Sequence, residues 1–96
     1  MTGWALYVLR TRQGHLYTGI ATDVKRRVQE HSGGRGAKAL RGRGPLELVY
    51  RKRIGEHGLA LRLEHRLKLR TKHEKEAIVR EQPTRAKLLA LLLVDM

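Results

Sequence analysis

The chain of 96 residues contains no cysteine. This absence excludes a disulfide scaffold, a thiolate nucleophile and a cysteine-ligated zinc site. Small secreted domains usually depend on disulfides, so we expect a reducing, intracellular location for this protein, namely the cytoplasm.

Long apolar runs are also absent. The longest, Leu88–Val94, has seven residues, whereas a helix that crosses a bilayer needs about 20. The segment Met1–Leu9 has no basic stretch before its apolar run and no cleavage-like site after it, so we expect no signal peptide. We therefore expect neither a membrane span nor a membrane partner.

Acidic and aromatic residues are scarce. Nine Asp and Glu face 21 Lys and Arg, which gives a formal net charge of +12. So few carboxylates disfavour a two-metal centre, which needs several of them clustered. Three tyrosines and one tryptophan offer little for extended base stacking, which argues against a dedicated single-strand binder. The positive charge predicts a polyanionic partner, most plausibly nucleic acid.

The basic residues are unevenly distributed. From Asp23 to Arg53 there are ten basic residues against three acidic ones, and from Arg62 to Arg80 seven against three. From Gln82 to Met96 there are only two against one. If these basic residues bind phosphates, the affinity should depend strongly on the salt concentration.

The length allows one folded domain and leaves no room for a second. We assign residues 1–82 to this domain and residues 83–96 to a C-terminal apolar helical extension. Any sequence-specific recognition module would have to come from elsewhere.

The first two apolar segments predict a β-hairpin. Trp4–Arg10 is a nearly continuous apolar run, typical of a strand buried on both faces, and His15–Ile20 is its partner. A three-residue loop ending at Gly14 in the left-handed conformation would place Tyr7 and Tyr17 on one face as diagonal neighbours. A two-residue loop would place them on opposite faces.

The next segment predicts a helix with an unusual inner face. The helix is expected to end near Ser32, with Thr22 or Asp23 as its N-cap. At 100° per residue, Arg27 and His31 lie beside the apolar stripe. The simpler interpretation of Arg27 is a side chain that extends along the edge of this stripe to solvent.

The rest of the chain predicts a basic loop, one strand and three helices. The glycine-rich loop over residues 33–44 contains four basic residues and no acidic one, and a third strand is expected over Leu46–Tyr50. Helices are expected over residues 59–70, 72 to about 80, and 84–94. The last is apolar around most of its circumference, so it packs either on the domain or on a second copy of the chain in a homodimer.

Glu64 is the only acidic residue between Gly58 and Lys72. By helical phase it borders the apolar stripe of its helix, and its sequence neighbours are basic. The simpler interpretation is an i,i+4 ion pair with Lys68, which contributes about 0.2 to 0.5 kcal/mol.

The order of these features resembles the GIY-YIG nuclease superfamily. It is carried by Ala5-Leu6-Tyr7, Tyr17-Thr18-Gly19, the spacing from Asp23 through Arg27 to His31, and the helical Glu64. The chain is similar to the small single-domain UPF0213 (YhbQ-like) group in Gly36-Ala37-Lys38, Arg41-Gly42, Pro45-Leu46 and Leu48-Val49-Tyr50. The first triad has Ala-Leu where the family has Gly-Ile, and Thr18 replaces the usual isoleucine. The resemblance, over about residues 4–79, implies an α/β (α+β) fold with a small three-stranded antiparallel sheet flanked by helices.

The resemblance also implies roles for individual residues. Tyr17, with His31 and Tyr7, would orient or deprotonate the attacking water. Arg27 would bind the scissile phosphate, and Glu64 would bind one divalent metal, Mg²⁺ or Mn²⁺. Free tyrosine titrates near pH 10, so its use as a base needs a neighbouring cation such as Arg27.

Two functions follow from these observations. The first is a metal-dependent endonuclease that acts on nucleic acid, with DNA preferred to RNA. The alternative is a nucleic-acid-binding module on a nuclease scaffold with little or no turnover. In either case target specificity would come from the structure of the nucleic acid or from a protein partner. The basic residues expected to contact the nucleic acid are Arg26, Arg35, Lys38, Arg41 and Arg43.

Overall fold

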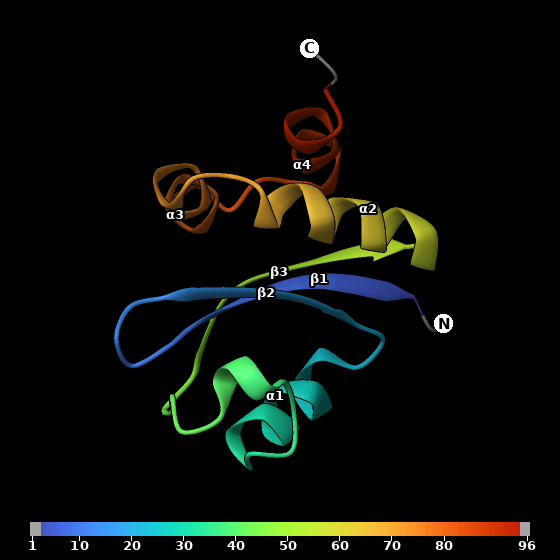
Figure 1. Cartoon of the computed structure of the whole chain (residues 1–96). Helices are drawn as coiled ribbons and strands as arrows, with labels where there is room; N and C mark the ends of the chain where they lie inside the picture. Colours follow the sequence, from blue (N-terminus) through green and yellow to red (C-terminus); the bar gives the residue numbers. More distant parts are fainter. Residues whose placement is uncertain (1–2, 95–96) are drawn as a thin grey trace.

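The computed structural model describes residues 3–94. In chain order the elements are β1 (Trp4–Arg10), β2 (Leu16–Ala21), α1 (Val24–Ser32), the 3₁₀ turn η1 (Lys38–Leu40), β3 (Glu47–Gly55), α2 (His57–Lys68), α3 (Lys72–Glu81) and α4 (Arg85–Leu92). The strands form one antiparallel sheet in the order β2-β1-β3. Helix α1 lies on one side of the sheet, and α2, α3 and α4 lie on the other (Figure 1). The predicted fold class is confirmed.

The hairpin between β1 and β2 has the predicted three-residue loop. Gly14 has a φ of 88°, in the left-handed region, and the Thr11 N–H donates to the His15 carbonyl at 2.8 Å. The register pairs Tyr7 with Gly19 and Leu9 with Tyr17. Because residues i and i+2 of a strand point to the same side, this register places both tyrosines on the α1 side of the sheet.

Helix α1 begins and ends as its sequence predicts. Asp23 is the N-cap, and its carboxylate accepts a hydrogen bond from the Arg26 N–H at 3.1 Å. Gly33 is the C-cap, and Gly34 follows with a φ of 76°. The side chain of His31 is buried beneath the helix.

Strand β3 is longer than predicted. The sequence suggested an end at Tyr50, where a basic run begins, but pairing with β1 continues to Gly55. Tyr50 and Ile54 are buried on one face, whereas Arg51 and Arg53 are exposed. A strand at the edge of a sheet can carry charged side chains on an uncovered face and still donate its backbone hydrogen bonds.

The central strand β1 separates two apolar clusters. Ala5, Tyr7 and Leu9 pack on the α1 side with Val24 and others. Leu6 and Val8 pack on the other side, against a larger cluster made by Tyr50, Ile54, Ala60, Leu63, Leu67, Ile78, Leu88 and Leu92. Burial on both faces explains why β1 is apolar along nearly its whole length.

The three C-terminal helices agree with the prediction apart from their ends. Helix α2 covers His57–Lys68, two residues earlier than expected at each end. Helix α3 has the predicted capping box, in which Thr71 and Glu74 exchange hydrogen bonds between side chain and backbone. Helix α4 is capped by Thr84 and ends at Leu92. No helix in residues 3–94 is long and apolar enough to cross a membrane.

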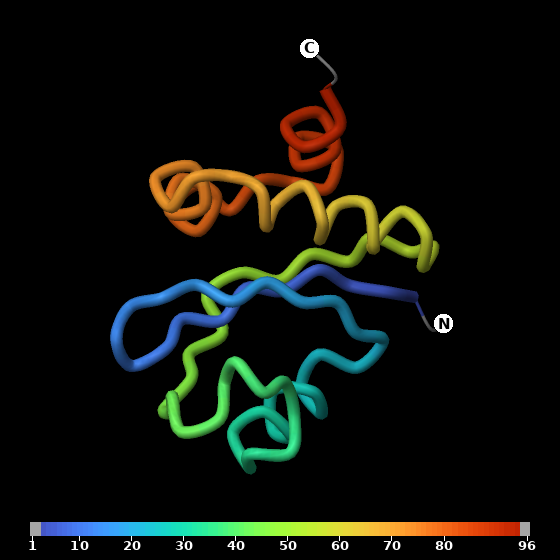
Figure 2. The backbone as a smooth tube through the Cα atoms, in the orientation of Figure 1, coloured from blue at the N-terminus to red at the C-terminus, as the bar shows by residue number. Residues whose placement is uncertain are grey.

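The segment between α1 and β3 stays in the α1 layer before it enters the sheet (Figure 2). The turn η1 interrupts the predicted loop, and its Leu40 is buried in the cluster beneath α1. The Arg43 carbonyl accepts a hydrogen bond from the Arg12 N–H at 3.2 Å. These contacts hold a glycine-rich segment against the sheet.

Of the two alternatives for the apolar C-terminal helix, the structure has it packed on its own domain. Leu88 and Leu92 belong to the same cluster as β1 and α2. Leu91 and Val94 are exposed on the outer side. The homodimer through this helix stays a prediction.

We expect Leu88→Ala to lower the free energy of unfolding by about 2 to 5 kcal/mol, because it leaves a cavity where a fully buried side chain packs. Leu91→Ala, on the same helix at a position 42% exposed, should change it by less than about 0.5 kcal/mol. Urea denaturation of both variants measures the difference. Equal effects would contradict the packing of α4 described here.

Candidate active site

Tyr7 lies across the backbone of Gly19 on the neighbouring strand. A Cβ added at Gly19 would lie 2.5 Å from the Tyr7 hydroxyl oxygen, well inside van der Waals contact. The register that pairs these two residues thus requires glycine at position 19. The glycine lets the tyrosine ring extend over β2, which brings its hydroxyl group to His31.

His31 is fixed through both ring nitrogens. Its Nε2 lies 2.8 Å from the Tyr7 hydroxyl oxygen, and its Nδ1 accepts a hydrogen bond from the Ala37 N–H at 3.1 Å. A backbone N–H can only donate, so Nδ1 carries no proton. The neutral ring therefore carries its proton on Nε2, where it donates to the Tyr7 oxygen. Tyr7 keeps its own hydroxyl proton to donate to another group.

Gly36 makes this hydrogen bond possible. A Cβ at position 36 would overlap the Nδ1 atom of His31. Only glycine lets the loop pass closely enough for the next residue, Ala37, to donate to the ring. Both residues lie in the Gly-Ala-Lys motif seen in the sequence, but the motif gave no indication that they contact His31.

Tyr17 completes an aromatic cluster with Tyr7 and His31. The ring centroids of Tyr7 and Tyr17 are 6.5 Å apart, and Tyr17 meets His31 edge-on at 5.5 Å. Tyr7 is almost fully buried, whereas Tyr17 is partly accessible. Of the three side chains brought together here, Tyr17 is therefore the one best placed to meet a substrate.

The buried position of Tyr7 governs its protonation. Burial is the main reason that the pKa of Tyr7 is raised to about 12, and the nearby Tyr17 adds to this effect. The Arg27 guanidinium lowers the pKa of Tyr7 through its charge and a hydrogen bond, but it does not offset burial. At neutral pH Tyr7 is a hydrogen-bond donor and does not act as a base.

Arg27 and His31 differ in charge although they share one helix face. Arg27 forms an ion pair with Glu30 at 3.1 Å, which keeps the pKa of Arg27 above its ordinary value. Burial, helped by the positive charge of Arg27, lowers the pKa of His31. The site thus contains a permanent cation beside a neutral imidazole.

Glu64 lies on α2, which packs against β1 and β2 on the opposite side of the sheet from α1. Its negative charge contributes to the raised pKa of Tyr7, so the carboxylate is within electrostatic range of the hydroxyl group. The side chain is 19% exposed and forms the i,i+4 ion pair with Lys68 at 3.4 Å. The ion pair with Lys68 that the spacing predicts for Glu64 is therefore present in the structure. This ion pair uses one carboxylate oxygen of Glu64 and leaves the second for another ligand.

The residues around Glu64 fit one kind of metal site. No group of three or more His, Asp or Glu side chains gathers anywhere in residues 3–94, so a cage made by the protein alone does not fit. Mg²⁺ is commonly bound through one or two carboxylates together with waters and the phosphate of a substrate. The single, partly accessible carboxylate of Glu64 fits that mode.

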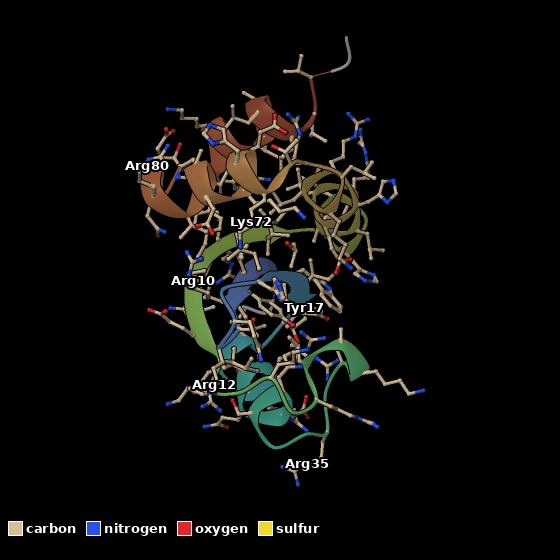
Figure 3. All side chains as sticks on the ribbon, turned by 60° about the vertical axis from the view of Figure 1, so that its left-hand side comes forward. Arg10, Arg12, Tyr17, Arg35, Lys72 and Arg80 are labelled. Carbon is tan, nitrogen blue, oxygen red and sulfur yellow. The ribbon has the colours of Figure 1, made fainter. Side chains whose placement is uncertain are left out.

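The basic residues predicted to contact nucleic acid are all exposed in the α1 layer: Arg26, Arg35, Lys38, Arg41 and Arg43. Arg26 also lies 3.7 Å from Glu30 in an ion pair. Figure 3 shows Tyr17 at the sheet and Arg35 at the far end of this layer. The role of all five residues stays a prediction.

Two depressions flank the aromatic cluster. One, of about 300 Å³, is bordered by Arg27, Arg26 and Trp4. The other, of about 190 Å³, is bordered by Tyr17, His15 and Arg43. The surface is therefore hollowed beside the partly accessible Tyr17 and, separately, beside Arg27.

We expect Gly36→Ala to displace His31 and to lower the free energy of unfolding by about 1 to 3 kcal/mol, as overpacking of a buried site does. Gly44→Ala is the matched control, because a Cβ at Gly44 meets nothing within 4 Å. Imidazole ¹⁵N shifts should report the Nε2–H form of His31 in the parent protein and in the control. An unchanged His31 spectrum in Gly36→Ala would contradict the role given to Gly36.

The lowered pKa of His31 makes stability depend on pH. Below the ordinary pKa of 6.5 the unfolded chain binds a proton at this residue that the folded chain does not. The free energy of unfolding should therefore fall as the pH drops below about 6.5, by at most about 1.4 kcal/mol per pH unit. His31→Gln should remove this part of the slope when denaturation is measured from pH 7.5 to 5. Identical slopes for the two proteins would show that His31 titrates normally.

Comparisons with known proteins bear on the family and the fold of this chain. Residues 3–77 match the family model of the GIY-YIG catalytic domain. The chain is 53% identical over 92 residues to a UPF0213 protein of Klebsiella pneumoniae, a match that covers 96% of this chain and 87% of that one. It is also 53% identical over 92 residues to the UPF0213 protein YhbQ of Escherichia coli K12, with 96% and 92% covered. The solution NMR structure of a UPF0213 protein from Bacillus halodurans is similar, with a TM-score of 0.56, 34% identity, and 99% and 100% of the chains covered.

Proposed function

Because this chain belongs to the GIY-YIG nuclease family and to its UPF0213 group, we propose that it is a metal-dependent endonuclease that hydrolyses phosphodiester bonds in nucleic acid, with DNA as the preferred substrate. The observation that supports this most directly is the convergence of Tyr7, Tyr17 and His31 beside the cationic Arg27. Phosphodiester hydrolysis needs an oriented water and a cation near the phosphate, and these residue types provide both.

Tyr17 is the residue we assign to the attacking water. His31 uses both ring nitrogens, for Tyr7 and for Ala37, so it cannot accept a proton without losing a hydrogen bond. Tyr7 is buried and protonated. In this arrangement Tyr7 and His31 position the Tyr17 ring, and Tyr17 orients the water or accepts its proton.

Arg27 is the residue we assign to the scissile phosphate. It is permanently charged and borders the depression of about 300 Å³. An arginine can donate two parallel hydrogen bonds to a phosphate, which supports the charge that develops on it. When Arg27 turns from Glu30 toward the phosphate, Arg26 still neutralises Glu30 from the same helix.

Glu64 is the residue we assign to the divalent metal. Mg²⁺ or Mn²⁺ bound there would stabilise the negative charge of the phosphate and of the leaving oxygen. The carboxylate would exchange its ion pair with Lys68 for this ligand. Arg27 would exchange Glu30 for the phosphate, and Glu64 would exchange Lys68 for the metal. Both exchanges suit a site that is completed only when substrate binds.

The alternative function, a nucleic-acid-binding module with little or no turnover, is favoured by the same two ion pairs. Arg27 and Glu64 each have a partner on their own helix, as they would if their roles were structural. Specificity would then come from the shape of the nucleic acid or from a protein partner.

The test is cleavage of labelled duplex, branched and single-stranded DNA and of RNA, with Mg²⁺, with Mn²⁺ and with EDTA. We expect cleavage of DNA that requires the metal. Glu64→Gln and Arg27→Gln should each lower kcat by about 10²- to 10³-fold, the loss typical of a transition-state contact. Glu81→Gln and Arg80→Gln are charge-matched controls on α3 and should cleave like the parent protein.

Three results would contradict the proposal. If no substrate is cleaved while salt-sensitive binding survives both substitutions, the binding module is the correct interpretation. If Glu64→Gln and Arg27→Gln cleave as fast as the parent protein, the activity belongs to a contaminant. A pH-rate profile that is identical in Tyr17→Phe would exclude Tyr17 as the base.

A further inference from the structure

We propose that a second basic groove, between the edge strand β3 and the start of α1, binds backbone phosphates of the nucleic acid that Arg27 engages. The groove has a volume of about 610 Å³ and is bordered by Lys25 on α1 and by Arg51, Lys52 and Arg53 on β3. This inference rests on the proposed function in so far as it concerns the same substrate. The residues predicted from the sequence for this role lie elsewhere, in α1 and the loop that follows it.

The sheet register places this groove on the same face as the aromatic cluster. Arg51 pairs with Tyr7, and Arg53 pairs with Ala5. The Cβ atoms of directly opposed residues in an antiparallel pair are about 4.5 to 5.5 Å apart, so the Arg51 side chain starts one strand away from the candidate active site. Helix α1 packs on β2 and leaves this part of β3 open.

The charges in the groove suit a polyanion. Three basic side chains on this face border it, those of Lys25, Arg51 and Arg53, against the one carboxylate of Asp23, which is engaged as the N-cap of α1. Within residues 3–94 neither Lys25 nor Arg51 forms an ion pair, whereas Arg26, Arg27, Arg70 and Lys72 all do. Both side chains are exposed. The positive charges of Lys25 and Arg51, which border one groove, repel one another, and phosphates would relieve that repulsion.

The groove adjoins the depression beside Arg27. Thr22 and Asp23 border both hollows, one on each side of the turn between β2 and α1. A strand whose scissile phosphate lies at Arg27 can therefore place its neighbouring phosphates past this turn and into the groove. A neutral ligand would gain nothing from these cations, so the chemistry points to a phosphodiester backbone.

Protection of a sheet edge is the competing explanation for the basic residues of β3. Charged side chains on an edge strand prevent it from pairing with other chains. That explanation accounts for Arg51 and Arg53 but gives no reason for Lys25 to face them across a hollow that leads to Arg27. It also predicts no change in binding to nucleic acid, so the two explanations can be separated.

The test compares two double variants with equal loss of charge. Lys25→Gln/Arg51→Gln alters the groove, and Arg80→Gln/Lys87→Gln alters α3 and α4 on the opposite side of the sheet (Figures 1 and 3). Affinity for a labelled duplex oligonucleotide is measured by anisotropy in EDTA at several salt concentrations. We expect the slope of log Kd against log salt to become shallower by about 1.8 for the groove variant, since each phosphate contact contributes about 0.9. The control should keep the slope of the parent protein.

Equal slopes for the two double variants would overturn the inference, whether both change or neither does. Because EDTA prevents cleavage, this result does not depend on the nuclease activity. A groove variant with a reduced slope supports the inference even if the parent protein cleaves nothing. If the parent protein does cleave, the groove variant should have a raised KM and an unchanged kcat, and an unchanged KM would count against the groove.

Discussion

The hydrogen bonds that link Ala37, His31 and Tyr7 are the constraint on which the rest of this structure depends. A protein of this size has a thin core, and burying an imidazole and a phenol in it is costly unless every polar atom has a partner. Within residues 3–94 no buried side-chain nitrogen or oxygen lacks one. Satisfying His31 at Nδ1 brings the loop after α1 back beneath the helix, and satisfying it at Nε2 fixes the Tyr7 ring across β2. Glycine is required at positions 19 and 36 because this chain of contacts leaves no room for a Cβ.

Features set by local rules were predictable from the sequence. The parity of a three-residue loop fixed which face carries Tyr7 and Tyr17, and helical phase placed Arg27 and His31 on the inner side of α1. The Glu64–Lys68 pair follows from their spacing of four residues. Each of these inferences needed only the geometry of one hairpin or one helix.

Features that join distant segments were not predictable in the same way. Strand β3 continues through its basic run because it stays paired with β1 there. The pattern of apolar residues in the sequence does not reveal this pairing. The contact of Gly36 and Ala37 with His31 depends on how the loop folds back, which no periodicity encodes. The groove at Lys25 and Arg51 likewise appears only when α1 and β3 are placed in space. The family resemblance supplied roles for the tyrosines, Arg27 and Glu64, but it did not indicate what positions them.

The charges of the candidate site are arranged so that substrate can replace partners already present. An exposed or half-exposed ion pair such as Arg27–Glu30 contributes only about 0 to 1 kcal/mol. In the proposed function, Arg27 would therefore lose little when it turns from Glu30, and it would gain a charge-assisted contact with the phosphate. Glu30 remains neutralised by Arg26 after that transfer. In the proposed function, the incoming phosphate would also supply the oxygens that a single carboxylate cannot, so Glu64 would gain a metal-binding partner in the same event. A site of this kind would be folded without substrate and would become competent for chemistry only around the nucleic acid.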